Sequence, residues 1–314
     1  MPQSRRSPQR KERFMKERYD ELLMLGERAI GADDFEGAAG FFADAESVAR
    51  RMGEMDLADR AFCNRCSVLV ELDRGADQIP KLKEILLRSS DTRNRFLAAY
   101  CTGVAYYISE DLERAASYAR RATRLARELD DQRLEQRSFN LVGTLAARDS
   151  RFDEAEEAFS LCLEAHRDVD GYQRVMAAQV EDNLGYVMMC TDRLDEGIRR
   201  CEAARKALVQ MNADHYLYEV LQDLCYGYVL ADELDMAFDY GEQALELAIE
   251  HSDQQVAKNC LFLLSEIAVR RGDTFGARRY LHELTAYYPE AGISEEIIDV
   301  FLATDLTTVV NLRG

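Results

Sequence analysis

The sequence predicts an all-α protein, a right-handed superhelical α-solenoid of about seven helix–turn–helix repeats. Only four of the 314 residues are proline, and the helix-favouring residues Ala, Leu, Glu and Arg dominate between Pro8 and Pro289. Small residues also recur inside helix-like segments about every 40 residues. A recurrence of this length is the signature of stacked structural repeats, so the two observations together favour a solenoid.

The recurrence is clearest for one small residue in the first helix of each unit. These positions are Gly26, Gly103, Gly143, Gly185, Cys225 and Ser265, and the last five are separated by 40, 42, 40 and 40 residues. A glycine inside a helix costs about 1 kcal/mol relative to alanine. Close packing of a second helix offsets that cost, so Gly185 in "NLGYVMM" predicts a close helix–helix contact.

A second set of small residues follows the first at a fixed offset of twelve. Its members are Ala38, Ala115, Ala155, Gly197, Ala237 and Ala277. Short polar strings such as "SEDL" and "TDRL" separate the two sets and are typical of tight turns with capping residues. Each unit is therefore expected to be a helix, a short turn and a second helix, with the small residues at the contact between them.

This pattern divides the chain into a tail, a solenoid and a cap. We expect a basic, flexible N-terminal tail at 1–12, a solenoid at 13–288, and a capping helix with an extended tail at 289–314. The expected repeats are 13–52, 56–88, 91–129, 131–167, 171–211, 213–251 and 253–287, of which the second is degenerate.

The pairs Leu25-Gly26 and Leu184-Gly185, with blocks such as "FEGAAGFFADA" and "LERAASYARRA", resemble the tetratricopeptide repeat (TPR). The period near 40 exceeds the usual ~34, and the proline that customarily ends each repeat is missing. The sequence is therefore more similar to the extended repeats of kinesin light chains and of Rap-type bacterial peptide sensors. The resemblance implies a bacterial protein-interaction scaffold or regulator, whose first helices line a concave groove that binds a peptide or an extended partner segment.

Helical spacing then selects the side chains that face this groove, next to the packing stripe. The candidate partner-binding residues are Tyr100, Tyr107, Arg137, Asn140, Thr144, Gln179, Asp182, Asn183, Tyr186, Glu219, Gln222, Asp223, Tyr226, Asn259 and Glu266.

Asparagine and tyrosine give this surface a specific use. An asparagine amide both donates and accepts, so Asn140 and Asn183 are suited to pair with the backbone of an extended peptide. Tyrosines supply apolar contact with a polar tip. Carboxylates outnumber cations on the surface, which favours a neutral or basic partner. Two other interpretations stay open: a merely solvated concave face, or a bond from Asn183 to a neighbouring helix.

Charge argues against nucleic acid as a ligand of the solenoid. The net charge is −18, yet residues 1–18 carry seven Arg and Lys against two Glu. An acidic body repels phosphates, so only an adaptor that uses the basic tail would bind nucleic acid. The rival from another class is a structural assembly subunit that uses its ends or convex face and binds no peptide. The sequence leaves open whether the chain forms a homodimer.

Other functional classes lack a motif. The sequence contains no run of 18 apolar residues, so a transmembrane helix is not expected. The N-terminal stretch lacks the apolar segment of a signal peptide, and we therefore expect a cytoplasmic location. Cys63 and Cys66 form a CxxC without a second ligand pair, and the four histidines fall in different units. With no Gly-rich phosphate loop either, neither an enzymatic activity, a metal site nor a cofactor is expected.

Overall fold

The computed structural model describes residues 8–32, 34–72, 74–164, 171–213, 216–289, 294–305, 307 and 310–313. These residues form fifteen α-helices and one short 3-10 helix, and none of them forms a strand. The chain divides into two compact units, Met1–Leu145 and Ala146–Gly314, and the boundary falls inside one helix. The all-α fold predicted from the sequence is confirmed.

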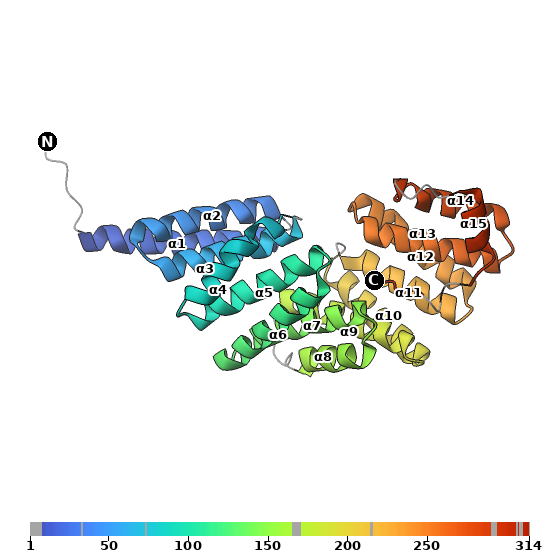
Figure 1. Ribbon diagram of the computed structural model, residues 1–314, viewed down its shortest axis with the longest axis horizontal. Coiled ribbons are helices and arrows are strands. Elements are labelled where there is room, and N and C mark those ends of the chain that lie inside the picture. The colour runs from blue at the N-terminus through green and yellow to red at the C-terminus, as the bar shows by residue number, and fades with distance from the viewer. Residues whose placement is uncertain are drawn as a thin grey trace. The chain divides into compact units, whose positions relative to one another are not determined.

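The N-terminal unit consists of helix pairs joined by short turns (Figure 1). Its elements are α1 (Pro8–Ile30), α2 (Phe35–Met52), α3 (Met55–Glu71), η1 (Ala76–Gln78), α4 (Ile79–Arg88), α5 (Thr92–Ile108), α6 (Leu112–Leu129) and the larger part of α7 (Gln132–Arg148). Helix α1 begins five residues before residue 13, where we expected the first repeat to start, and residues 1–7 of the predicted tail lie outside the described residues.

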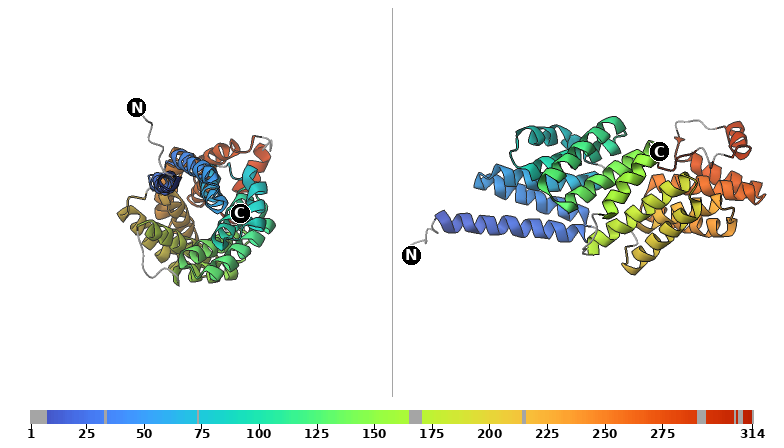
Figure 2. Two further views of the ribbon diagram at one scale, coloured as in Figure 1. Left: turned by 90° about the vertical axis from the view of Figure 1, so that its left-hand side faces the viewer. Right: turned by 90° about the horizontal axis from the view of Figure 1, so that it is seen from below.

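The C-terminal unit continues the same alternation of first and second helices. After the end of α7 it contains α8 (Phe152–Glu164), α9 (Gly171–Cys190), α10 (Leu194–Gln210), α11 (Leu217–Leu230), α12 (Leu234–Glu250), α13 (Gln254–Arg270), α14 (Thr274–Thr285) and α15 (Glu295–Leu302). Within each unit, most helices that follow one another in the sequence also lie side by side, for example α5 with α6 and α9 with α10 (Figure 2). The helix pairs match the repeats expected from the sequence.

Left-handed residues end the helices at regular intervals. From Asp192 to Gly272 a residue with positive φ recurs every 20 residues, and only the last of them is glycine. At Asp232 the backbone N–H bonds to the carbonyl of Val229, and the N–H of Glu233 reaches back to Tyr228. This bond pattern satisfies carbonyls that the helix end leaves unpaired, so no proline is needed to stop the helix.

The small residues lie where the two helices of a repeat meet. A Cβ atom added to Gly185 in α9 would meet the sulfur of Cys201 at 2.6 Å and the carbonyl oxygen of Gly197 at 2.9 Å, both in α10. Ala115, Ala155 and Ala237 are 0% exposed. The glycine in "NLGYVMM" is therefore required by close packing, as the sequence predicted.

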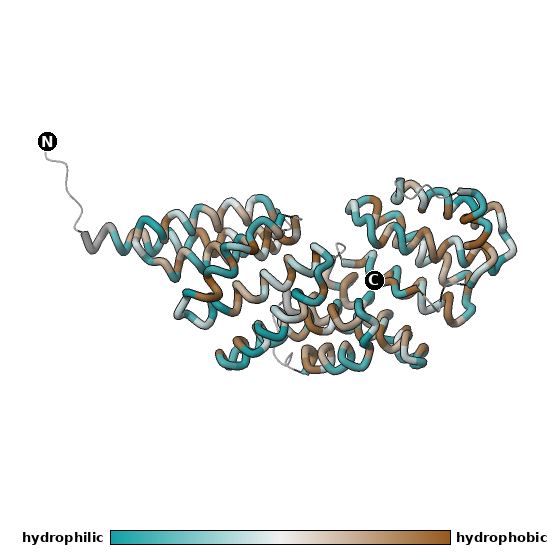
Figure 3. The backbone as a smooth tube through the Cα atoms, in the orientation of Figure 1, coloured by the Kyte–Doolittle hydropathy of each residue, from teal (hydrophilic) through white to brown (hydrophobic). Residues whose placement is uncertain are grey.

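Apolar and polar residues alternate along most helices, visible as alternating brown and teal along the tube (Figure 3). No helix in the described ranges combines the length and apolarity that crossing a bilayer requires. The CxxC thiols of Cys63 and Cys66 lie in the core, as does the thiol of Cys101. All three residues are 0% exposed, and burial raises the pKa of each thiol, that of Cys101 to about 12. A thiol held in its protonated form is a poor nucleophile and a poor metal ligand.

Candidate functional site

In the C-terminal unit a non-helical stretch of the chain lies against the first helices of three repeats. We call Asp305, Thr307 and Val310–Arg313 the return segment. Its described residues are irregular or in turns rather than in a strand, and Thr307 and Leu312 are 1% and 3% exposed. The side chains that hold it come from α9, α11 and α13, the helices that the sequence predicted to line a groove.

Tyr186 of α9 holds the backbone of this segment. Its hydroxyl donates to Oδ1 of Asn311 at 2.9 Å and accepts from the N–H of Leu312 at 3.0 Å. Its ring lies under the guanidinium of Arg313, with 4.9 Å between the guanidinium carbon and the ring centroid. One tyrosine thus contacts three successive residues, with its apolar face and its polar tip both in use.

Asn259 of α13, one of the candidate groove residues, makes a bond to a peptide group of the kind expected of inward-facing asparagines. Its amide N–H donates to the carbonyl oxygen of Leu312 at 2.8 Å and to Oε1 of Gln222 at 2.9 Å. Gln222 in turn donates to Oδ1 of Asp223 at 3.0 Å. Gln222 of α11 thus links Asn259 of α13 to Asp223, and these bonds hold both side chains facing the return segment.

A pair of buried carboxylates binds the arginine of the segment. Asp182 and Asp223 are 2% and 0% exposed. The guanidinium of Arg313 donates to Asp223 and lies 3.5 Å from Oδ2 of Asp182. Burial raises the pKa of both carboxyl groups, the negative charge of Asp223 raises that of Asp182 further, and Arg313 opposes both shifts.

The segment is also held by contacts with the end of α7 and with Arg270 of α13. The side-chain amide of Asn311 donates to the carbonyls of Ala147 and Arg148, the last residues of α7, at 3.0 and 3.1 Å. Arg270 of α13 donates to Oγ1 of Thr307 at 3.0 Å and to Asp305 at 3.3 Å. These contacts satisfy carbonyls at a helix end and keep the segment on the surface of the first helices.

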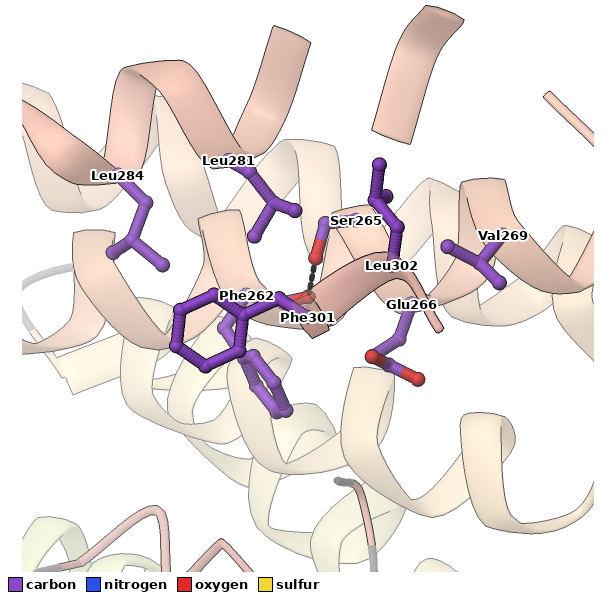
Figure 4. A pocket seen from close by; sticks show the side chains of 8 residues that line it. All are labelled: Phe262, Ser265, Glu266, Val269, Leu281, Leu284, Phe301 and Leu302. Atoms are coloured by element: carbon purple, nitrogen blue, oxygen red, sulfur yellow. Dashed lines mark hydrogen bonds between the residues drawn. The ribbon is translucent and has the colours of Figure 1, made fainter. Parts of the chain in front are cut away.

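Glu266, another predicted groove residue, lies instead in a small apolar pocket between α13, α14 and α15 (Figure 4). The pocket is lined by Phe262, Ser265, Glu266, Val269, Leu281, Leu284, Phe301 and Leu302. Burial, with the nearby charge of Asp305, raises the pKa of Glu266 to about 7, and Arg270 opposes this shift.

The raised pKa of Glu266 predicts a pH-dependent stability. In the unfolded chain the carboxyl titrates near its ordinary value of 4.5, so the folded state binds the proton more tightly. Stability is then lost as the pH rises from about 4.5 to about 7, by an amount on the order of 1–3 kcal/mol. Glu266→Gln should remove this loss and melt higher than wild type at pH 8. Thermal melts from pH 4.5 to 8 measure it, with the exposed Glu246→Gln as control; parallel curves for wild type and Glu266→Gln would contradict it.

The predicted residues of the N-terminal unit form contacts of their own. Arg137 lies over the ring of Tyr100, with 4.5 Å between the guanidinium carbon and the ring centroid. Asn140 has a buried Oδ1 that accepts no hydrogen bond from the described part of the chain. Tyr107 and Thr144 are half-buried. The return segment and the residues that hold it all belong to the C-terminal unit.

The structure changes the expected picture of the groove in one respect. The sequence predicted an open concave surface, whereas Asp182, Tyr186, Asp223 and Tyr226 are buried, and each of them contacts a residue of the return segment. Glu219 adds its charge near Arg313.

Gln179 and Asn183 are half-buried, and the described residues provide no hydrogen-bond partner for either side chain. Sequence reasoning missed Asn311 and Arg313 themselves. The sequence feature that could have identified them is the arginine in "VVNLRG", because a cation that follows an acidic groove stripe is a candidate to pair with it.

No group of three or more His, Cys, Asp or Glu side chains within the described ranges is arranged to hold a metal ion. Polar groups at the site are donors and acceptors suited to a peptide backbone, and carboxylates suited to a cation. The arrangement can therefore bind a polypeptide segment non-covalently.

Comparison with solved structures identifies the fold. The chain is similar to a Rap protein complexed with Competence and Sporulation Factor, with a TM-score of 0.71 and 11% identity over 94% of this chain and 79% of that chain. It is also similar to NprR in complex with its cognate peptide NprX, with a TM-score of 0.67 and 13% identity over 92% of this chain and 81% of that one.

A third similar structure is a signal transduction ATPase with a tetratricopeptide repeat sensor from Pyrococcus horikoshii. Its TM-score is 0.59 at 15% identity, over 94% of this chain and 46% of that chain. No protein-family model and no curated protein sequence matches the chain. On the strength of its helix pairs and of these structural matches, the chain is a TPR-like α-solenoid that resembles the Rap-type proteins.

Proposed function

We propose that this protein is an interaction scaffold or regulator that binds a peptide, or a segment of another protein, in the groove of its C-terminal unit. In this proposal the ligand is neutral or basic, and the first helices α9, α11 and α13 supply the contacts. The structural matches support the proposal at the level of the fold, because two of the similar proteins were solved with a peptide or factor bound.

One observation carries the proposal. Side chains from three successive repeats, Tyr186, Asp223 and Asn259, hold an irregular segment by its backbone and by its arginine. Neither bond to the backbone requires a particular side chain on the segment, and the arginine contact adds a preference for a cation. The same groups are equally able to hold a segment of another molecule.

Selection from a displayed library of random twelve-residue peptides tests the proposal. The baits are the wild-type chain and the full-length Leu312→Asp variant, because the return segment covers the same side chains in wild type. Selected peptides should lose about 5- to 150-fold in affinity for Asn259→Ala, since truncation leaves a peptide carbonyl unpaired at a cost of about 1–3 kcal/mol. Calorimetric titration measures the loss.

The matched control is Gln243→Ala, an exposed amide on the second helix α12. Its affinity for the selected peptides should equal that of wild type. Asn183→Ala tests one of the candidates that make no hydrogen bond to the return segment. If neither bait selects a peptide whose binding depends on Asn259, Tyr186 or Asp223, the proposal is wrong, and the structural assembly subunit becomes the better interpretation.

A further inference from the structure

We propose that the return segment is an internal ligand of this site, which a partner segment of the same chemistry must displace before it can bind. This inference rests on the proposed function and adds a regulatory step to it. The expected displacing ligand carries an arginine preceded by an apolar residue and an asparagine, as in Asn311–Arg313.

The contacts of the segment are those of a bound peptide rather than those of a repeat. Tyr186 and Asn311 are 125 residues apart in the sequence, and the segment adds neither a helix to the solenoid nor a strand to a sheet. Among the described residues its backbone groups bond to side chains: those of Leu312 to Tyr186 and Asn259, and the N–H groups of Thr307 and Arg313 to Asp305 and Asn311 of the segment itself. A further packed helix would satisfy its own backbone and leave those side chains without a role.

The two buried carboxylates, Asp182 and Asp223, also support a ligand-binding site. Asp182 and Asp223 lie together out of water, and Oδ1 of Asp182 has no hydrogen-bond partner among the described residues. A buried ion pair rarely stabilises a fold more than apolar residues of the same volume would. A purely structural cover would thus gain little from two carboxylates around one guanidinium, whereas a site that recognises a cationic ligand requires them.

Attachment to the same chain makes the internal ligand a strong competitor. A segment on a short tether meets its site at an effective concentration on the order of 1 mM. If the same segment in free form binds with a Kd of about 10–100 µM, the tethered copy lowers its apparent affinity about 10- to 100-fold. We therefore expect the wild-type chain to bind weak ligands poorly and to bind a ligand whose affinity exceeds that of the free return segment.

Fluorescence anisotropy with a labelled synthetic peptide of residues 304–314 tests the inference. The proteins are the full-length wild type, Leu312→Asp and Val310→Asp. Leu312 is 3% exposed and packs in the same apolar cluster as Tyr186 and Tyr226, so a carboxylate there should expel the segment. Val310 is 36% exposed, and its substitution adds the same charge without touching Tyr186 or Asn259.

We expect Leu312→Asp to bind the peptide at least tenfold more tightly than wild type, and Val310→Asp to behave as wild type. A peptide whose arginine is replaced by alanine should lose at least tenfold on Leu312→Asp. Excess unlabelled peptide added to wild type should speed hydrogen exchange at the Leu312 amide, which donates to Tyr186 in the closed state. Equal affinity of wild type and Leu312→Asp for the peptide would overturn the inference.

Two further measurements keep the test decisive. Circular dichroism melts show whether Leu312→Asp folds, and Arg313→Ala provides an independent release that leaves Leu312 in place. If Leu312→Asp and Arg313→Ala bind library peptides through Asn259 but not the 304–314 peptide, the inference fails and the proposed function stands. If they bind neither, both fail.

Discussion

Arg88→Ala is expected to lower the free energy of unfolding by about 3 kcal/mol. Arg88 of α4 donates to Oδ1 of Asp59 at 2.6 Å, and Asp59 of α3 is 0% exposed. Truncation leaves a buried carboxylate without its cation, which costs about 3–5 kcal/mol. We expect the lower end of that range, because the Arg88 side chain is itself 36% exposed, so that water can enter the space it leaves and solvate part of the Asp59 carboxylate.

Glu84→Ala is the matched control, because Glu84 pairs with the same guanidinium, at 3.1 Å, but is 64% exposed. An exposed pair of this kind contributes about 0–1 kcal/mol. Urea denaturation of both variants at pH 7 measures the difference. Burial already raises the pKa of Asp59, so the loss in Arg88→Ala should shrink at acid pH, where the carboxyl is protonated. Equal midpoints for the two variants would show that Asp59 is solvated or paired elsewhere.

Gly197→Ala is expected to destabilise by about 1–3 kcal/mol, although alanine favours the helix by about 1 kcal/mol. An added Cβ would lie 2.5 Å from the carbonyl oxygen of Gly185 and would also overlap Met189. The oxygen belongs to the backbone of α9, so α9 and α10 would have to move apart. Because α9 carries Asp182 and Tyr186, the same variant should also loosen the return segment and speed hydrogen exchange at Leu312.

Gly40→Ala tests the opposite case in the same kind of element. Gly40 lies on the exposed face of α2, and nothing lies within 4 Å of its added Cβ. Without a clash, the substitution only lowers the conformational entropy that the residue loses on folding, so it should stabilise the protein by about 0.5–1 kcal/mol. Thermal melting of both variants checks the pair, and a rise in melting temperature for Gly197→Ala as well as for Gly40→Ala would mean that the α9–α10 contact is looser than described.

The repeat architecture was predictable because its causes are local and recur. A glycine such as Gly185 conflicts with helix propensity, and the recurrence of small residues at a fixed offset identifies the close contact that offsets the conflict. The helix pairs follow the expected repeats from α3 to α14. The sequence also identified the first-helix stripe, and Asp182, Tyr186, Asp223 and Asn259 do lie together in the C-terminal unit.

What covers that stripe was decided by the tertiary structure alone. The contact between Tyr186 and Asn311 joins residues 125 positions apart, and the return segment has no periodicity that would reveal its partner. Helix periodicity reports which face of an element is apolar, but it does not report which distant segment satisfies the polar groups beside that face. The sequence by itself therefore determined the repeats and the acidic stripe. Only the folded chain decided that Asn259 rather than Asn183 holds a backbone carbonyl, and that the guanidinium between the two aspartates comes from Arg313.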